Sequence, residues 1–192
     1  MAQQGMPSPI EVYEGAVAQM QPIIGGIRPD QLTASTPCSK WDVQSLINHN
    51  IKVSQNVRSI ITGGAGVDPF SVSHPIPSEG AEVAFQASTN FLLAAVKGAG
   101  VLEKEVDTPF GRMQVGQFLM MPIADIVIHK WDLAKATNQD TSLDSGLAEV
   151  CYAVLSPAVE GGRQGGFFGP EVTIPISASI QDKLLGISGR QP

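Results

Sequence analysis

The segment from Val115 to Thr137 constrains the fold more than any other part of the chain. Its residues are predicted to form one long helix, and the apolar side chains spread along it require that helix to be buried: Ile123, Ile126, Val127, Ile128 and Leu133. Pro122 falls inside the segment and is expected to start or kink the helix. The buried helix therefore predicts an all-α bundle in which other helices cover it.

Four further segments carry helical spacing or helix-start signals, at 9–25, 41–62, 78–96 and from Ser142 or Asp144 to Leu155. Ser39 is expected to cap the second of these helices, with Asp42 three residues on as a variant capping box. Ser78 is expected to cap the third. These helices are the predicted partners of the central one.

Two segments interrupt the helical pattern. Residues 106–115, which contain TPFGRM, are predicted to form a small hairpin or an ordered loop. From Ser156 the chain is rich in Gly and Pro, with a short helical patch near 180–185. This tail is expected to pack over the bundle because its apolar residues need burial: Phe167, Phe168, Val172, Ile174 and Ile176. We expect a single domain over 1–192, with the bundle at about 8–158 and the tail at about 159–192.

Composition excludes several classes of protein. The chain has 192 residues and a net charge of −6, and it shows no basic stripe, so we expect no nucleic-acid partner. Its apolar stretches are too short to span a bilayer, and its first residues do not have the pattern of a signal peptide. Cys38 and Cys151 show no CxxC spacing, so no disulfide framework or zinc ribbon is expected. A cytoplasmic protein is the resulting expectation.

The clearest chemical signal is IADIVIHKWDLAKAT, in which Asp125 and His129 are four residues apart. On a helix they share one face and can bind one metal ion, although a surface pair or a capping interaction has the same spacing. Asp132 lies on nearly the same stripe and is a candidate partner that orients an imidazole. His49, in LINHN, is a satisfied core or surface histidine unless it faces this pair across the bundle. In that case it completes a three-ligand site with an open position.

Three other residues are candidates for a functional role. His74, in SVSHPIP, is predicted to be solvated. Cys38 precedes the second helix and is either a small buried residue or a thiol made reactive by the helix N-terminus. Arg112, in FGRM, is a candidate for binding a substrate carboxylate, with a solvated or turn-capping arginine as the alternative.

The same segments resemble a known family. STPCSKWDVQSLINHN is similar to "TPC-x-x-WDV-x-x-L-x-x-H" near the start of the mycothiol-dependent maleylpyruvate isomerase N-terminal domain, and IADIVIHKWDLAKATNQ resembles its "E/D-x-x-x-H-x-WDLA-x-ATGQ" segment. The ending FFGPEVTIPISASIQDKLLGISGRQP looks like that of a small branch which closes with "LL-x-x-x-GR-x-P". Together these similarities extend from about Ile10 to Pro192.

The resemblance implies a DinB-like four-helix bundle that binds a divalent metal through His49, Asp125 and His129. Zinc is the expected ion, with nickel, iron and manganese as alternatives. The isomerase itself often has Glu where this chain has Asp125. The resemblance also implies mycothiol or a similar low-molecular-weight thiol as cofactor, in a thiol transferase or isomerase reaction on a small electrophile. The isomerase has a further C-terminal domain that contributes to its active site, and we expect no full counterpart of it here.

Two other functions remain open at this point. The chain is alternatively a non-catalytic protein of the same fold that binds a metal or a small ligand in a pocket formed by its Gly- and Pro-rich loops. It is alternatively a helical interaction module, for example a homodimer through an exposed bundle face. The second alternative requires His49 to lie far from His129.

Overall fold

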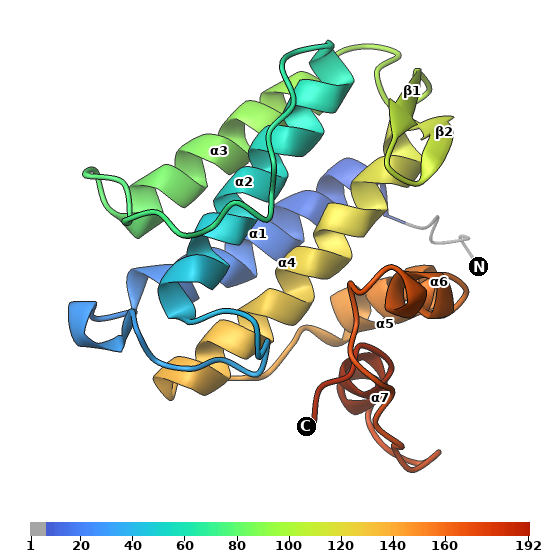
Figure 1. Ribbon diagram of the computed structural model, residues 1–192. Coiled ribbons are helices and arrows are strands. Elements are labelled where there is room, and N and C mark those ends of the chain that lie inside the picture. The colour runs from blue at the N-terminus through green and yellow to red at the C-terminus, as the bar shows by residue number, and fades with distance from the viewer. Residues whose placement is uncertain (1–6) are drawn as a thin grey trace.

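The computed structural model describes residues 7–192, and four long helices form its centre (Figure 1). They are α1 (Pro9–Gly25), α2 (Val43–Thr62), α3 (Ala81–Val96) and α4 (Val115–Thr137). Helices α1 and α2 each pack against both α3 and α4. The expected four-helix bundle is therefore confirmed, and α2 and α4 are neighbours in it. The signal-peptide interpretation rests partly on residues 1–6, which lie outside the described part.

The start of α1 agrees with its sequence. Ser8 and Glu11 form a capping box in which the Ser8 hydroxyl accepts from the Glu11 N–H and the Glu11 carboxylate accepts from the Ser8 N–H. Pro9 occupies the first turn, where its missing N–H costs nothing. A 3-10 turn (Pro29–Gln31) follows α1 in the loop to α2.

Helix α2 begins later than predicted, and its cap is Asp42 rather than Ser39. The Asp42 carboxylate accepts a hydrogen bond from the Ser45 N–H at 2.8 Å. Asp42 also pairs with Ser35 in a β-bridge, and the Thr36 hydroxyl donates to the Trp41 carbonyl. These local bonds close residues 36–41 into a loop with a turn at Ser39 and Lys40, so the helix begins after Asp42 and Trp41 lies outside it.

Two other helix predictions need correction. Helix α3 begins at Ala81 behind Gly80, whose φ of 93° lies in the left-handed region, and not behind Ser78. Of the two roles expected of Pro122, starting the helix is wrong, because α4 continues on both sides of it, and a kink at this residue stays a prediction. Its missing N–H leaves the Phe118 carbonyl without its usual donor four residues on.

A small hairpin closes the end of the bundle where α4 begins (Figure 1). It pairs β1 (Glu105–Thr108) with β2 (Gly111–Gln114) in antiparallel register, with Val106 opposite Met113. Gly111 has a φ of 101°, which a residue with a side chain rarely adopts. The hairpin alternative for this segment is thus confirmed.

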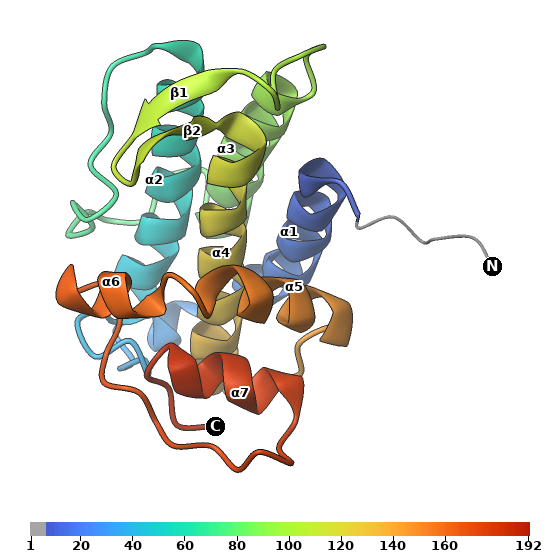
Figure 2. The same ribbon diagram turned by 90° about the vertical axis from the view of Figure 1, so that its right-hand side faces the viewer.

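The C-terminal part runs across α4 as α5 (Ser145–Leu155), α6 (Val159–Gln164) and α7 (Ile180–Ile187) (Figure 2). Asp144 caps α5 through the Leu147 N–H at 3.0 Å. Helix α6 was not predicted. Helix α7 packs on α5 through Leu184 and Leu185, both fully buried.

The tail therefore packs on the bundle as expected, but partly for a different reason. Phe167 is 51% exposed and Ile176 is 94% exposed, so these two residues do not supply the burial that was expected of them. Phe168, Val172 and Ile174 are half-buried. Within residues 7–192, no helix has both the length and the apolarity needed to cross a bilayer.

Candidate metal centre

The three predicted ligands converge between α2 and α4. His49 lies in the second turn of α2, and Asp125 and His129 lie in the middle of α4. The Nε2 atom of His49 is 3.3 Å from Oδ2 of Asp125, and the Nε2 atom of His129 is 3.3 Å from Oδ1 of the same carboxylate. One donor atom from each residue lies within 4.8 Å of the other two. The site therefore brings His49 together with two residues that lie 76 and 80 positions further along the chain.

Both imidazoles have their Nδ1 atoms occupied by an acceptor. The Nδ1 of His49 is 2.8 Å from the Pro69 carbonyl oxygen, and the Nδ1 of His129 is 2.9 Å from Oδ2 of Asp132. Each Nδ1–H donates to its partner, so each Nε2 is directed toward Asp125. This is the arrangement of histidines that bind a metal through Nε2.

The loop of residues 63–80 supplies the carbonyl that orients His49. The buried Asn48 amide donates to the carbonyls of Val72 and His74 and ties the loop to α2. Pro69 is thereby held over the His49 ring. The orientation of one candidate ligand thus depends on its sequence neighbour.

The donor set fits a divalent ion. A tetrahedral ion with bonds of about 2.0–2.1 Å holds neighbouring donor atoms about 3.3–3.4 Å apart, close to the spacing found here. The Oδ2 atom of Asp125 is buried and makes no hydrogen bond, even though His49 Nε2 lies 3.3 Å away. A buried carboxylate oxygen without a hydrogen-bond donor would be stabilised by a bound cation.

The contact between Asp125 and His129 shifts the pKa values of the two groups in opposite directions. Burial alone would lower the pKa of His129, but the carboxylates of Asp125 and Asp132 raise it to about 9. Burial alone would raise the pKa of Asp125, but the imidazoles of His129 and His49 hold it well below its ordinary value. The site therefore favours positive charge opposite Asp125.

A second layer of charge lies behind His129. Asp132 is fully buried and accepts two bonds from the Arg190 guanidinium, Nη2 to Oδ2 at 2.8 Å and Nε to Oδ1 at 3.3 Å. Asp132 matches the predicted geometry of a partner that orients an imidazole. Arg190 was given no role from the sequence, although a carboxylate predicted on a buried helix signals that a cation must lie nearby.

Aromatic rings surround the site on its open side. The Trp41 ring lies 4.3 Å from the His49 ring, centroid to centroid, and Phe70 lies 5.7 Å from His49. Phe70 contacts Phe167, which contacts Phe110 at the tip of the hairpin. These three phenylalanines are each 51% exposed. They extend an apolar surface outward from the candidate ligands.

Cys38 lies closer to the site than its sequence position suggested. Its sulfur is within 4.8 Å of one donor atom each of His129 and Asp132. Burial raises the pKa of the Cys38 thiol. The pairing with a histidine is tertiary, so no local sequence signal could have indicated it.

Arg112 and His74 have other partners. The Arg112 Nε donates to Glu105 on the neighbouring strand at 3.0 Å, and Asp107 lies 3.8 Å away. Its role in binding a substrate carboxylate stays a prediction. His74 is exposed, as predicted, with its Nε2 3.4 Å from the Ser71 hydroxyl.

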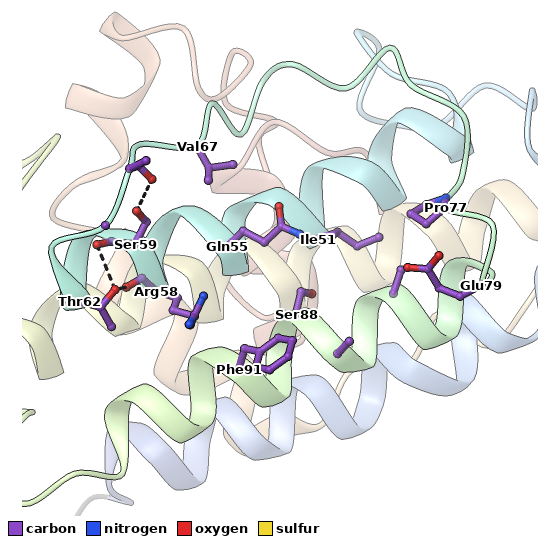
Figure 3. Close-up of a pocket in the computed structure, with 14 residues that line it drawn as sticks. Ile51, Gln55, Arg58, Ser59, Thr62, Val67, Pro77, Glu79, Ser88 and Phe91 are labelled. Carbon is purple, nitrogen blue, oxygen red and sulfur yellow. Dashed lines mark hydrogen bonds between the residues drawn. The ribbon is translucent and has the colours of Figure 1, made fainter.

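A cavity of about 640 Å³ lies apart from these ligands, between α2, α3 and the loop of residues 63–80 (Figure 3). Arg58 lies over the Phe91 ring at 5.5 Å from its centroid on one side of the cavity. Glu79 and Pro77 line the other end. The residues that line it include none of His49, Asp125 and His129.

Comparison with known proteins identifies the family of this chain. Residues 13–134 match the model of the mycothiol maleylpyruvate isomerase N-terminal domain, a span that includes all three converging residues. Two uncharacterised proteins of Mycobacterium tuberculosis, from strains CDC 1551 / Oshkosh and ATCC 25618 / H37Rv, are each 27% identical over 186 residues. The alignment covers 95% of this chain and 97% of each relative. No solved structure gives a significant match. Because the matched region is more than half of the chain, this protein belongs to the mycothiol maleylpyruvate isomerase N-terminal domain family, with its DinB-like helical bundle.

Proposed function

We propose that His49, Asp125 and His129 bind a divalent metal ion, and that the protein is a metal-dependent enzyme of the thiol transferase or isomerase class. The observation that carries the proposal is the convergence of two Nε2 atoms on one carboxylate, each 3.3 Å from it. The substrate proposed is a small electrophile, and the thiol is mycothiol or a similar low-molecular-weight thiol. The family description supports the thiol, since it names mycothiol.

Zinc is the expected ion because two imidazoles and one carboxylate are typical zinc ligands, and the donor spacing suits tetrahedral coordination. Nickel, iron and manganese accept the same donors and are the alternatives. When bound with three protein ligands, such an ion would supply Lewis acidity and hold a thiol as its thiolate near neutral pH.

The residues of the chain contribute orientation and access. Pro69 and Asp132 fix the two imidazole rings through their Nδ1 atoms. The side chain of Asp125 is 30% exposed, whereas those of His49 and His129 are 4% and 6% exposed, so the site meets solvent at Asp125. Trp41 and Phe70 cover the neighbouring imidazole with apolar surface and would favour an electrophile that carries an apolar or aromatic group.

Metal analysis tests the first half of the proposal. The purified full-length protein, as isolated and after incubation with Zn²⁺ and removal of excess, is expected to hold close to one ion per chain. His129→Ala should abolish binding, while His74→Ala, which removes an exposed histidine from the same chain, should leave it unchanged. A wild-type protein that stays metal-free after reconstitution contradicts the metal site.

A coupled assay tests the second half. Metal-loaded protein is incubated with mycothiol and monochlorobimane, and formation of the fluorescent conjugate is followed against the rate without protein. Acceleration by wild type and His74→Ala, but not by His129→Ala, is expected. Metal binding without acceleration by mycothiol or bacillithiol would leave the site intact and refute the thiol chemistry.

The cavity between α2 and α3 favours small-ligand binding as a second candidate function. Its lining includes the apolar side chains of Ile51 and Phe91 and the guanidinium of Arg58, which forms no ion pair within residues 7–192. An anionic ligand with an apolar part fits this lining. Calorimetric titration with small aromatic carboxylates, on wild type and on Arg58→Gln, tests the site, and identical heats for the two proteins would exclude it.

A further inference from the structure

The C-terminal segment places one buried arginine behind the candidate metal ligands. Arg190 is only 8% exposed, and it holds Asp132 through two nitrogen atoms of its guanidinium. Its remaining Nη1 donates to the Ser188 carbonyl at 2.8 Å. Each of the three guanidinium nitrogen atoms therefore donates to a protein acceptor, and the fork geometry specifies the position of the Asp132 carboxylate.

Asp132 connects this arginine to His129. Its Oδ2 atom accepts from Arg190 Nη2 at 2.8 Å and from His129 Nδ1 at 2.9 Å. A histidine that donates Nδ1–H and binds a metal through Nε2 is formally neutral. It would then bring no charge to balance the buried carboxylate, and Arg190 would be the cation that does so.

A backbone turn at Gly189 places Arg190 next to Asp132. Gly189 has a φ of 83°, and a Cβ placed on it would lie 3.0 Å from the backbone of Gly169. The Arg190 N–H donates to the Leu185 carbonyl at 2.8 Å, which turns the chain back at the end of α7. The Leu184 and Leu185 side chains anchor that helix in the core. In the ending LLGISGR, the two leucines are buried, the last glycine allows the turn, and that turn places the arginine.

We propose that Arg190 is a positioning residue of the metal site. It fixes the Asp132 carboxylate, which fixes the tautomer and the orientation of His129, and the C-terminal segment thereby sets the metal affinity of a site built on α2 and α4. The inference rests on the metal binding proposed above for His49, Asp125 and His129. It concerns a residue outside the segment that matches the family model.

The alternative is a purely structural ion pair that only docks the tail. Arg163 provides the matched control, because it anchors the same tail without contacting Asp132. Its Nη2 donates to the Ile187 carbonyl at 2.7 Å, and its guanidinium pairs with Glu160 and Glu171. A role in docking predicts similar effects of Arg163 and Arg190 on metal binding, whereas a positioning role separates them.

The test measures Zn²⁺ affinity by competition with a chromophoric chelator, on full-length wild type, Arg190→Gln, Arg190→Lys and Arg163→Gln. Loss of a group that orients a metal-binding histidine typically weakens affinity about 10–100-fold, which is the loss expected for Arg190→Gln. Arg190→Lys keeps the charge but not the two-point grip and should fall between that variant and wild type. Arg163→Gln should bind as wild type does, even if its metal-free melting temperature falls.

Absorption spectra of the Co²⁺-loaded proteins give a readout that docking alone would not change. The visible bands should shift in Arg190→Gln and remain unchanged in Arg163→Gln, because only the first disturbs the His129 ring. Equal affinities and equal spectra for these two variants would overturn the inference. If Arg190→Gln does not fold, Arg190→Lys decides, and wild-type affinity in that variant overturns it. A wild-type protein that binds no metal refutes the proposed function itself, which is a distinct result.

Discussion

Replacing Asp132 by Asn should destabilise the metal-free protein more than any exposed carboxylate replacement. Asp132 is fully buried and Arg190 is 8% exposed, so neither charge can be compensated by water. The amide can still accept the His129 Nδ1–H, but it removes the counterion from a guanidinium now bound at 2.8 and 3.3 Å. Breaking a buried pair by removing one partner costs about 3–5 kcal/mol.

This magnitude is measurable by urea unfolding in the presence of a chelator. With a slope of about 2 kcal/mol per molar urea, the midpoint should fall by about 1.5–2.5 M. Glu105→Gln is the matched control, because it makes the same chemical change opposite Arg112 at the surface. The Arg112 and Glu105 side chains are 63% and 59% exposed, and such pairs contribute less than about 1 kcal/mol.

A double variant separates two causes of the lost stability, the unpaired buried charge and the altered packing. Asp132→Asn combined with Arg190→Met removes the buried charge while it keeps the acceptor for His129. Most of the stability lost in Asp132→Asn should return, since an uncompensated charge costs more than a missing pair. An Asp132→Asn protein as stable as Glu105→Gln would refute the reasoning, and so would a double variant less stable than the single one.

Three further predictions concern pH, metal and the tail. The folded-state pKa of His129 is raised to about 9 from 6.5, so its stabilisation of the metal-free protein is complete below pH 6.5 and is lost as the pH rises through 9. The loss is on the order of 3 kcal/mol, and urea midpoints at pH 6 and pH 9.5 should show it in wild type but not in His129→Ala. Zn²⁺ at about 100 times its Kd should stabilise the protein by about 2.7 kcal/mol and raise Tm by about 5–11 °C, which a chelator should reverse. Gly189→Ala should lower Tm and weaken Zn²⁺ binding together, because its φ of 83° and its contact with Gly169 force the arginine away; unchanged affinity would contradict the described route from tail to site.

Much of the bundle was predictable because its signals are local. The limits of α4 follow from a long apolar segment, and Asp144 caps α5 through its own neighbour three residues on. The start of α2 could not be predicted from local signals. Ser39 and Asp42 are both good helix caps, and the β-bridge between Ser35 and Asp42 decides between them. Helix α6 was missed because two of its six residues are glycine, which lowers helix propensity.

The residues of the candidate site were likewise predictable only where their signals are local. The spacing of Asp125 and His129 indicates one face of one helix, and Asp132 follows on nearly the same stripe. His49 joined the predicted set only through the family resemblance, because periodicity cannot say which helices are neighbours. Arg190 and Cys38 reach His129 and Asp132 through tertiary folding alone, so no spacing in the sequence could have placed them there.

The contact between Trp41 and His49 gives this site an optical reporter of its own. The chain has two tryptophans, and only Trp41 stacks on a candidate ligand, with ring centroids 4.3 Å apart, whereas the Lys135 ammonium lies over the ring of Trp131. An ion bound at the Nε2 atom of His49 would place a cation close to this indole and change its emission. Emission from Trp41 is therefore expected to follow metal occupancy in real time, without any added dye.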